Sequence, residues 1–409
     1  MKGNRVFIIT IFMFFSFAAA GYALTADSLG GVEIHGFVSQ GYLKSHSYNY
    51  LANDSKKGSF QFNEMGVNFS KQVTDNLRIG IQFFSRDLGD AANNKISLDW
   101  AYGDYHFKDW LGIRVGKIKI PFGLYNETRD MDMLRTCIVL PQGIYNDLLR
   151  DVLIAMQGAG AYGTIPLHKA GSLEYQAMAG VINLDKDNGI GKYVESKFYG
   201  SLDVLDDFNT DTSYAASLRW NTPLDGLALK VTTLKYDYDL PVEMSFLGTT
   251  IETSVGIKNF LMVYSAEYLL NDLTLAAEYS TTELETSFTL PIYGRITSET
   301  KGESYYAMGS YRFKEWLEVG AYYMERYPDK HDKKGHSLKQ SSGYGYNFPE
   351  YLAWLKDTAL FIRFDVNDYF LFKVEGHYLD GVETVMFGDN PNFKDKSWYY
   401  FAAKATFSF

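Results

Sequence analysis

The run Tyr369-Phe-Leu-Phe-Lys-Val-Glu-Gly-His-Tyr378 alternates between apolar and polar side chains. One parity carries Phe370, Phe372, Val374 and Tyr378, and the other carries Lys373, Glu375 and His377. Because successive side chains of a strand point to opposite faces of a sheet, this run predicts a β-strand with one apolar and one charged face. The same period recurs at 77–86 and 317–326. Alternation alone fits a soluble sandwich as well as a membrane barrel.

The first 23 residues have the pattern of a secretory signal peptide. Lys2 and Arg5 precede an uncharged run at 6–20, and small residues offer cleavage after Ala20 or Ala23. The uncharged run is short for a membrane helix, so we expect a signal peptide at 1–23 and a mature chain at 24–409. Cys137 is the sole cysteine, which leaves no intrachain disulfide and no lipid-attachment site after the signal.

The composition narrows the class of the mature chain. Aromatic residues make up 16% of the sequence and the formal net charge is −10. No stretch after the signal approaches the roughly 18 consecutive apolar residues of a membrane helix. The negative charge argues against a nucleic-acid partner. A soluble all-β protein and a transmembrane β-barrel remain.

The connections between the predicted strands favour the barrel. The gaps after even-numbered strands are short, whereas those after odd-numbered strands are long and reach about thirty residues at 121–150, 183–211 and 327–355. The predicted strands are 32–44, 59–71, 77–86, 95–107, 112–120, 151–164, 172–182, 212–220, 226–236, 259–269, 272–280, 303–313, 316–326, 356–366, 368–380 and 397–409. This order predicts an all-β, transmembrane antiparallel barrel of about 16 strands, with short periplasmic turns and long extracellular loops. A count of 18 strands stays open.

Two of the short turns are almost identical in sequence. They are Tyr105-His-Phe-Lys-Asp-Trp-Leu111 and Tyr311-Arg-Phe-Lys-Glu-Trp-Leu317. Both place aromatic residues beside a tight turn, as the aromatic girdle at a membrane interface requires. We expect both turns at the periplasmic end of the barrel.

The last strand, 398–409, resembles the C-terminal strand of bacterial outer-membrane proteins. Tyr399, Phe401, Phe407 and Phe409 share one parity. The resemblance implies that the terminal Phe409 is a recognition signal for the barrel-assembly machinery. Since lipid cannot satisfy an open sheet edge, we expect this strand to pair with the first strand at 32–44.

A further resemblance lies at Arg114-Val-Gly-Lys-Ile-Lys-Ile-Pro-Phe-Gly-Leu124. This run is similar to outer-membrane porins, in particular to the group that includes phosphate-selective channels. The resemblance implies that the third long loop, 121–150, folds into the pore and narrows it, and that the protein is a homotrimer in the outer membrane of a Gram-negative bacterium. The chain lacks the dense row of wall arginines found in phosphate-specific members.

The charges of this region define the predicted pore site. The candidate loop residues are Glu127, Arg129, Asp130, Asp132 and Asp147, and the candidate wall residues are Arg78, Arg86, Arg114, Lys117 and Lys119. A loop of one sign facing a wall of the other would set a field across the pore. A β-bulge at Gly116 would keep Arg114, Lys117 and Lys119 facing the lumen. In the alternative interpretation these ion pairs are only structural, and the two lysines lie above the membrane.

Strand parity elsewhere supplies further lumen-facing charges. The basic set is Arg219, Lys230, Arg312, Arg326, Arg363, Lys373 and Lys404, and the acidic set is Glu64, Asp104, Glu174, Glu267, Glu278, Glu318 and Asp365. The two signs nearly balance, so the negative excess is expected in the loops. An acidic vestibule of this kind would favour cations weakly.

Motifs for cofactors and metals are weak. Gly158 to Gly163 fits a dinucleotide-binding pattern, but Pro166 follows where a helix would start, so no cofactor is expected. Asp185-Lys-Asp-Asn-Gly189 looks like the start of a calcium loop, although Gly189 replaces an oxygen ligand. No metal site is assigned, and a loop calcium ion stays an open alternative.

The leading functional prediction is a porin for passive diffusion of small hydrophilic solutes and ions, not an enzyme. Its expected partners are those solutes, outer-membrane lipid and lipopolysaccharide, and the barrel-assembly machinery. The alternatives are a solute-specific channel, with a site formed by Phe122, Tyr125 and Tyr145 and the basic wall, and an outer-membrane hydrolase on a barrel scaffold.

Overall fold

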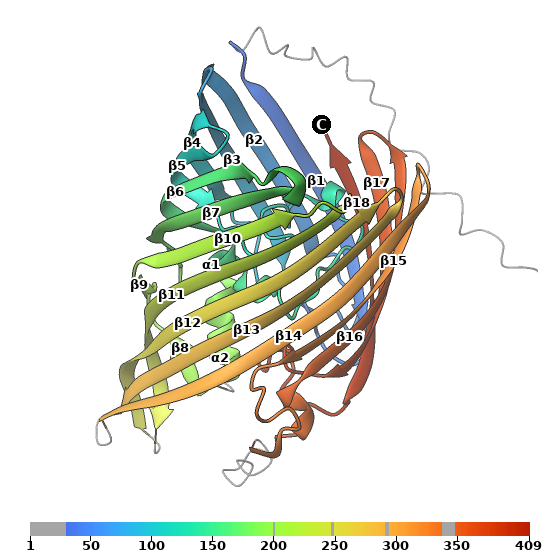
Figure 1. Cartoon of the computed structure of the whole chain (residues 1–409). Helices are drawn as coiled ribbons and strands as arrows, with labels where there is room; N and C mark the ends of the chain where they lie inside the picture. Colours follow the sequence, from blue (N-terminus) through green and yellow to red (C-terminus); the bar gives the residue numbers. More distant parts are fainter. Residues whose placement is uncertain (1–29, 199–200, 247–248, 291–293, 338–347) are drawn as a thin grey trace, which may run out of the picture.

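The computed structural model describes residues 30–198, 201–246, 249–290, 294–337 and 348–409 of the 409-residue chain. The expected signal peptide at 1–23 lies outside these ranges. Within them, the chain forms one closed antiparallel β-barrel of 16 strands (Figure 1). Two short extra strands, β8 (Leu202–Val204) and β9 (Asn209–Thr210), pair with the outer part of β11.

The first eight barrel strands are β1 (Glu33–Ser45), β2 (Phe62–Thr74), β3 (Leu77–Leu88), β4 (Ser97–Lys108), β5 (Leu111–Lys119), β6 (Ala155–Pro166), β7 (Ser172–Val181) and β10 (Ser213–Asn221). The other eight are β11 (Leu227–Phe246), β12 (Thr249–Leu270), β13 (Leu273–Leu290), β14 (Gly294–Lys314), β15 (Leu317–Tyr327), β16 (Leu355–Asn367), β17 (Phe370–Gly381) and β18 (Ser397–Ser408). The short helices are η2 (Asp132–Leu134), η3 (Asp147–Leu149), α1 (Arg150–Leu153), η4 (His168–Ala170), α2 (Gly189–Lys197) and η6 (Glu350–Ala353). Among the described residues, no helix is long and apolar enough to span a membrane.

The barrel closes between the first and last strands, as the sequence predicts. Phe37 pairs with Ser408 and Ser45 with Tyr400. The ladder ends with two backbone hydrogen bonds between Gly36 and Phe409, at 3.1 and 3.0 Å. No edge of the sheet is therefore left open at this seam.

All sixteen predicted strands correspond to strands of the barrel, but four of them are longer than expected. β11 to β14 contain 20, 22, 18 and 21 residues, about twice the length needed to cross a membrane. The predicted long loops at 237–258 and 281–302 are therefore wrong, because most of these residues extend the strands. The extension forms a tall wall on one side of the barrel (Figure 1).

The ends of the barrel differ in their connections. We call the end that carries connections such as Asn271-Asp272 the short-turn end, and the opposite end the long-loop end. Both aromatic repeats lie at the short-turn end, where Trp110 and Trp316 are exposed. The rings of Tyr105 and Phe107 are 4.5 Å apart, and those of Tyr311 and Phe313 are 4.9 Å apart. This exposed belt is typical of a lipid interface.

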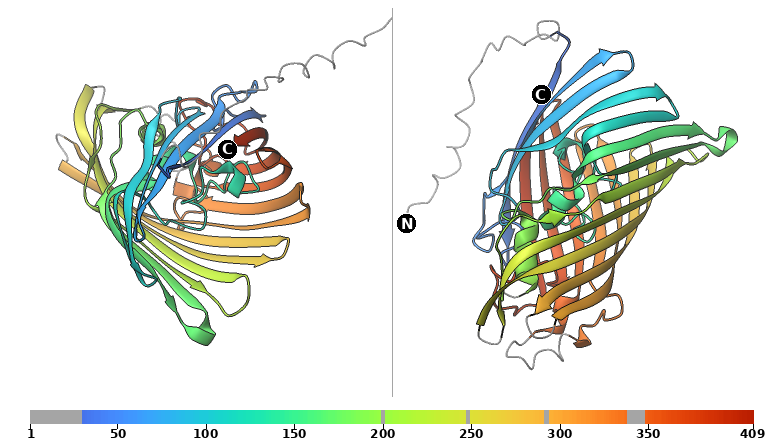
Figure 2. Two further views of the ribbon diagram at one scale, coloured as in Figure 1. Left: turned by 90° about the horizontal axis from the view of Figure 1, so that it is seen from above. Right: turned by 90° about the vertical axis from the view of Figure 1, so that its left-hand side faces the viewer.

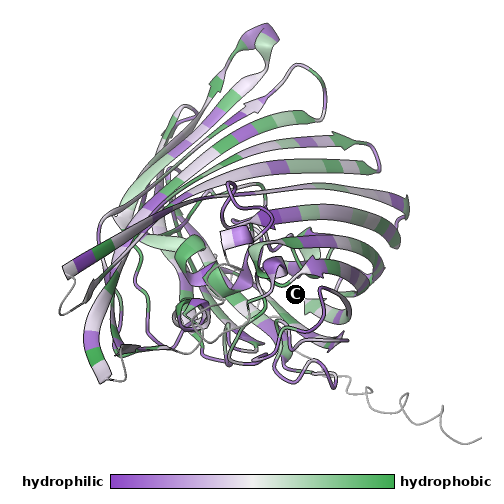
Figure 3. Cartoon of the chain, turned by 90° about the horizontal axis from the view of Figure 1, so that it is seen from below, coloured by the Kyte–Doolittle hydropathy of each residue, from purple (hydrophilic) through white to green (hydrophobic). Residues whose placement is uncertain are grey.

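A second aromatic group lies on the outer face nearer the long-loop end. Glu325 accepts hydrogen bonds from Tyr305 at 2.7 Å and Tyr323 at 2.6 Å, and also from Tyr327. Beyond it, the outer face of the tall wall carries ion pairs, including Lys258–Glu285 at 3.0 Å. Charged side chains on that face indicate that the tall wall rises out of the lipid band. Figure 3 shows the alternation of apolar and polar residues along the strands.

The β-bulge lies one strand away from its predicted position. The β5–β6 ladder continues in register through Gly116, and the register shift occurs where β3 meets β4 and skips Asp99. Gly116 still has a φ of +135°, and a Cβ there would lie 2.2 Å from the Ala101 carbonyl oxygen. Glycine is therefore required by this close approach, whereas the extra residue is Asp99.

Candidate channel site

Residues 120–154, between β5 and β6, form what we call the inner loop. Its backbone and side chains contact strands from several sides of the ring. Leu124 N donates to Glu278 on β13, Ile138 N donates to Glu375 on β17, and Asp132 accepts from Thr406 on β18. The inner loop therefore lies inside the barrel (Figure 2).

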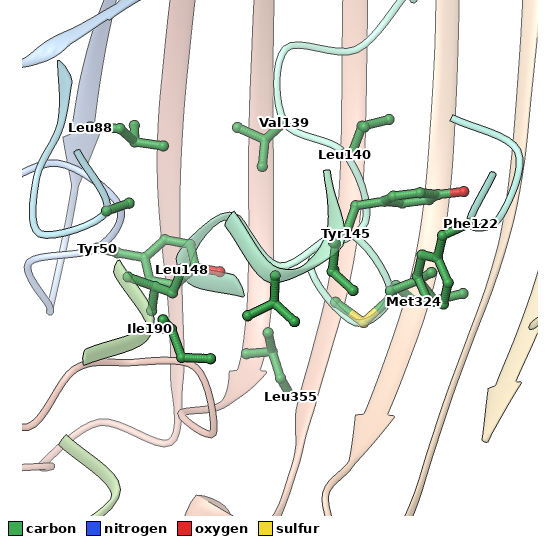
Figure 4. Packing of buried hydrophobic residues seen from close by; sticks show 14 of the residues in the cluster. Tyr50, Leu88, Phe122, Val139, Leu140, Tyr145, Leu148, Ile190, Met324 and Leu355 are labelled. Carbon is green, nitrogen blue, oxygen red and sulfur yellow. The ribbon is translucent and has the colours of Figure 1, made fainter. Parts of the chain in front are cut away.

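The inner loop has an apolar core of its own. Phe122, Leu140 and Tyr145 are almost fully buried, together with Met324 on β15 and Leu355 on β16 (Figure 4). The sequence interpretation rested on the charges of this loop and overlooked the apolar run at 137–140, which was the available signal. Apolar burial fixes the loop against the wall and fills much of the lumen with side chains.

The first group of predicted charges meets around Asp130, and we call it the Asp130 cluster. Arg150 donates to both carboxylate oxygens of Asp130, at 2.8 and 2.7 Å, and to Asp99 at 2.6 Å. Lys119 lies 3.7 Å from each of the two carboxylates. Burial would raise the pKa of Asp130, but Arg150 and Lys119 hold it well below its usual value. Asp99, which the bulge turns inward, was missed by the sequence interpretation.

A second group, the Asp147 cluster, joins the loop to β3. Arg86 on the wall and Arg129 on the loop lie 3.2 and 3.1 Å from the Asp147 carboxylate. Gln142 donates to the same carboxylate at 2.9 Å. Burial opposes ionisation here, but the two arginines lower the pKa of Asp147.

The third group, the Asp132 cluster, lies against the last two strands. Lys373 on β17 and Lys404 on β18 lie 3.1 and 3.4 Å from Asp132, and Thr406 donates to it at 2.7 Å. Lys404 also pairs with Glu64 on β2. Burial would raise the pKa of Asp132, but the two lysines lower it strongly. The alternation along the strands correctly predicted that both lysines face the lumen, but it gave no indication that they pair with Asp132.

Four predicted site residues have their main contacts elsewhere. Arg78 donates to Ser70 on β2, Arg114 donates to Asp104 at 2.9 Å, and Lys117 donates to the Leu98 carbonyl at 2.6 Å. These partners all lie on the wall, so the structure does not bring these three residues to the loop charges. The backbone carbonyl of Glu127 accepts from Lys119, and within the described ranges no ion pair joins its carboxylate.

Glu278 on β13 contacts the inner loop from the side opposite the Asp132 cluster. The sequence indicated only that this carboxylate faces the lumen. Glu278 accepts hydrogen bonds from Tyr145 at 2.5 Å, Tyr306 at 2.7 Å and Ser265 at 2.6 Å. It also accepts from the backbone of Leu124 at 2.9 Å. We call this the Glu278 cluster, and it joins the loop turn at 123–125 to the tall wall.

A buried histidine supports another contact of the inner loop. His377 lies between Asp357 at 3.0 Å and Glu375 at 2.8 Å. Glu375 in turn accepts hydrogen bonds from the backbone of Ile138 and Val139. The alternating run 369–378 placed His377 in the lumen, but nothing in the sequence indicated the two carboxylates around it.

Two cavities lie on either side of the loop turn, both along the tall wall. The short-turn cavity has a volume of about 430 Å³ and is lined by residues that include Tyr125, Glu267 and Asn271. The long-loop cavity has a volume of about 380 Å³ and is lined by residues that include Phe122 and Ser280. The Glu278 cluster lies between them.

The possible calcium motif belongs to a helix. Asn188 begins α2, and its side-chain oxygen accepts hydrogen bonds from the backbone of Ile190 and Gly191 at 3.1 and 3.3 Å. Lys95 occupies a position beside the Asp185 carboxylate. The run at 185–189 therefore forms a capped helix start.

The closed ring of 16 strands with an internal loop defines a porin-like barrel fold. No protein-family profile and no curated protein matches the sequence. Solved structures do match. OmpT, an outer membrane protein of Vibrio cholerae, has a TM-score of 0.54 at 12% identity, with 92% of this chain and 97% of that one covered. OmpT has also been solved in a trimer form.

Two further structures are similar over the same share of the chain. Salmonella typhi OmpF, in complex with daunomycin, has a TM-score of 0.53 at 12% identity, and covers 92% of this chain and 97% of its own. The outer membrane channel DcaP of Acinetobacter baumannii has a TM-score of 0.52 at 10% identity, with the same coverages. At these identities the likeness establishes the fold.

Proposed function

We propose that this protein is an outer-membrane porin that conducts small hydrophilic solutes and ions by passive diffusion. The observation that carries the proposal is the pair of cavities on either side of the loop turn. In this proposal the two cavities are joined along the tall wall past the Glu278 cluster, which lies between them. On the other sides the inner loop is packed and ion-paired, so solutes have no comparable route there.

The charges along this passage favour anions slightly. Arg135, Arg312 and Arg363 in the short-turn cavity are balanced by three acidic residues, Glu267, Asp272 and Glu318. The long-loop cavity is lined by two cations and one carboxylate. At the turn between the cavities, the Glu278 carboxylate is opposed by the Lys230 ammonium, which donates to the Gly123 carbonyl at 2.7 Å. The charges at this wall therefore cancel, and they matter more than those of distant loops, because salt screens the latter. We therefore propose weak anion selectivity in place of the cation preference suggested by net charge.

The same proposal places the protein in its membrane. The short turns face the periplasm and the long loops face the exterior of a Gram-negative bacterium, with lipopolysaccharide around the outer aromatic group. Phe409 serves as the signal to the assembly machinery. A homotrimer is proposed from the porin-like fold, with the trimer form of Vibrio cholerae OmpT as the supporting example.

The experiment is conductance in planar bilayers with purified protein. Stepwise currents are expected, with a reversal potential in asymmetric KCl that indicates a small excess of chloride flux. A matched cysteine pair in a Cys137→Ala background tests the route. The pair is Thr274→Cys and Leu275→Cys, because Thr274 lines the short-turn cavity and Leu275 is exposed on the outer face.

A charged thiosulfonate added from the short-turn side should reduce current through Thr274→Cys and leave Leu275→Cys unchanged. The absence of current steps in well-folded protein would refute the channel. Equal block of both variants would refute the route.

The hydrolase alternative lacks comparable support. A nucleophilic serine needs a histidine that an acid orients. Among the described residues, His46 lies 3.0 Å from Ser47, but both belong to the exposed bend after β1, where His46 stacks on Tyr399. His377, the buried histidine, contacts carboxylates and Tyr322.

A further inference from the structure

The long-loop cavity has the composition of a binding site. Its apolar lining comes from three separate elements that meet around it. These residues are Phe122 and Leu153 of the inner loop, Ile190 and Val194 of α2, and Tyr236 and Tyr238 of β11. Its volume of about 380 Å³ is that of roughly a dozen liquid water molecules. Cavities of this size with mostly apolar walls and a few fixed polar groups are typical of small-molecule sites.

Charge is confined to one end of this cavity. Glu383 accepts from Lys197 on α2 at 2.8 Å and from Arg326 on β15 at 2.6 Å. These three are the charged residues among those that line the cavity in the described ranges. Two cations share one carboxylate, so a single positive charge is left uncompensated.

The basic end is open to a ligand from solvent. The Lys197 side chain is 38% exposed, whereas the Glu383 side chain is fully buried. The Lys197 ammonium can therefore offer a free proton donor to a second anion while it still pairs with Glu383. Burial opposes ionisation of Glu383, but Arg326 and Lys197 lower its pKa to about 2, so this carboxylate stays charged at neutral pH.

The wall opposite α2 supplies neutral hydrogen-bonding groups. Apart from Leu284, the positions of β13 and β14 that line the cavity carry hydroxyls in place of charges. These residues are Ser280, Thr282, Thr286 and Thr300. Hydroxyl groups can hydrogen-bond to a polar part of a solute, and the solute does not need a second charged group for this.

We propose that the long-loop cavity binds a small organic monocarboxylate with an aromatic or aliphatic body before it crosses the barrel. The body lies between α2, the inner loop and β11, and the carboxylate pairs with Lys197. This inference rests on the proposed channel, since it makes the cavity the entry site of the passage. It adds a solute class that general diffusion does not require.

Isothermal titration calorimetry of the full barrel in nanodiscs tests the site with three defined solutes. These are 3-phenylpropionate, its neutral amide, and acetate, which has the charge without the body. Saturable binding is expected for 3-phenylpropionate, about tenfold weaker binding for the amide, and no saturation for acetate. A factor of ten is the size expected for one charge-assisted contact.

Two matched pairs of variants locate the site. Lys197→Gln should weaken binding of 3-phenylpropionate about tenfold and leave amide binding unchanged, whereas Lys192→Gln on the exposed side of α2 should have no effect. Thr282→Phe should fill the cavity and abolish binding of both solutes. Thr281→Phe, at the neighbouring position on the outward face of the same strand, should bind as wild type.

The outcomes separate this inference from the channel itself. Conductance without saturable binding of 3-phenylpropionate would overturn the site and leave the channel intact. Saturable binding without conductance would overturn the channel and leave the site intact. Equal affinity of the acid and the amide, or equal effects of Lys197→Gln and Lys192→Gln, would refute the role of Lys197.

Discussion

The inner loop meets two parts of the barrel wall in different ways. Toward β15–β18 and β1–β4, which we call the seam side, it is held by buried ion pairs of the Asp130, Asp132 and Asp147 clusters and by apolar packing. Toward the tall wall, hydrogen bonds join the turn at 123–125 and Tyr145 to Glu278, Lys230 and Thr232. This difference in attachment is why the proposed path is drawn beside the tall wall.

Removing the inner loop should produce the largest change in conductance, because the loop would then contact neither the seam side nor the tall wall. Deletion of 126–147 is expected to raise conductance severalfold and to weaken ion selectivity, since water then fills the lumen around the former ion-pair partners. Heat-modifiable migration on gels would verify that the barrel is closed. Unchanged conductance of a folded deletion variant would place the loop outside the path.

A single change on the seam side should cost stability. Asp132→Asn leaves Lys373 and Lys404 without their shared loop partner, and loss of one member of a buried pair costs about 3–5 kcal/mol. Urea unfolding in lipid vesicles measures this loss. Glu285→Gln is the control, because its pair with the 55% exposed Lys258 should contribute less than about 1 kcal/mol. Equal losses would contradict the seam-side attachment.

The tall-wall contact should govern conductance more than stability. Glu278→Ala removes the acceptor of three hydroxyls, so we expect a loss of about 1–3 kcal/mol and a larger single-channel current. Glu325→Ala is a matched control, since Glu325 accepts from three tyrosines on the outer face. Its stability should fall similarly while its current stays at the wild-type level. A raised current in both variants would disconnect Glu278 from the passage.

Acid should loosen the seam side gradually. The pKa values of Asp130, Asp132 and Asp147 are lower in the folded protein than the ordinary value of 3.8. Their ionised forms therefore stabilise the fold fully at pH values above 3.8, and this contribution declines as the pH falls below it. Urea midpoints between pH 7 and pH 2 should show this decline, with a shallower slope in Asp132→Asn. A pH-independent midpoint would contradict the ion pairs.

The smallest expected effect concerns Cys137, whose thiol should not react in the native protein. Cys137 is buried in the inner loop, and burial raises the pKa of its thiol to about 12. Iodoacetamide at pH 8 should therefore leave the native protein unlabelled, since the thiolate is the reactive form. Labelling should appear in urea and, more slowly, in Asp132→Asn, because Lys373 of the Asp132 cluster also donates to the Cys137 carbonyl. Rapid labelling of the native barrel would show that the loop is loosely held.

Most of the barrel could be predicted from sequence because lipid imposes a strict pattern. In the lipid band, strands must alternate apolar and polar residues, and all sixteen were found this way. The outer halves of β11 to β14 were missed because their outward face is polar, although inward positions such as Leu240, Val242 and Val255 are apolar and buried. There the outward positions carry charges, such as the ion pair of Glu283 and Lys301, so the alternation is the reverse of that in the lipid band, where apolar side chains face outward.

The site could be predicted only in part, for a reason of distance along the chain. The sequence identified Asp130, Asp132 and Asp147 as loop charges, but not their partners. Asp132 and Thr406 are 274 positions apart, and no local pattern relates them. The bulge at Asp99 also reverses parity within β4, which a regular alternation cannot anticipate. The pore role of these charges stays a prediction.

The position of Lys404 and Thr406 on the final strand sets an order of events during biogenesis. Both groups reach Asp132 only after the last strand has paired with β1 and sealed the ring. Contacts so remote in sequence form late, because a long segment of chain must first be closed. The contacts of the loop with β13 and β17, through Glu278 and Glu375, do not depend on that closure. The contacts of Asp132 with the last strand therefore mark a ring that has closed.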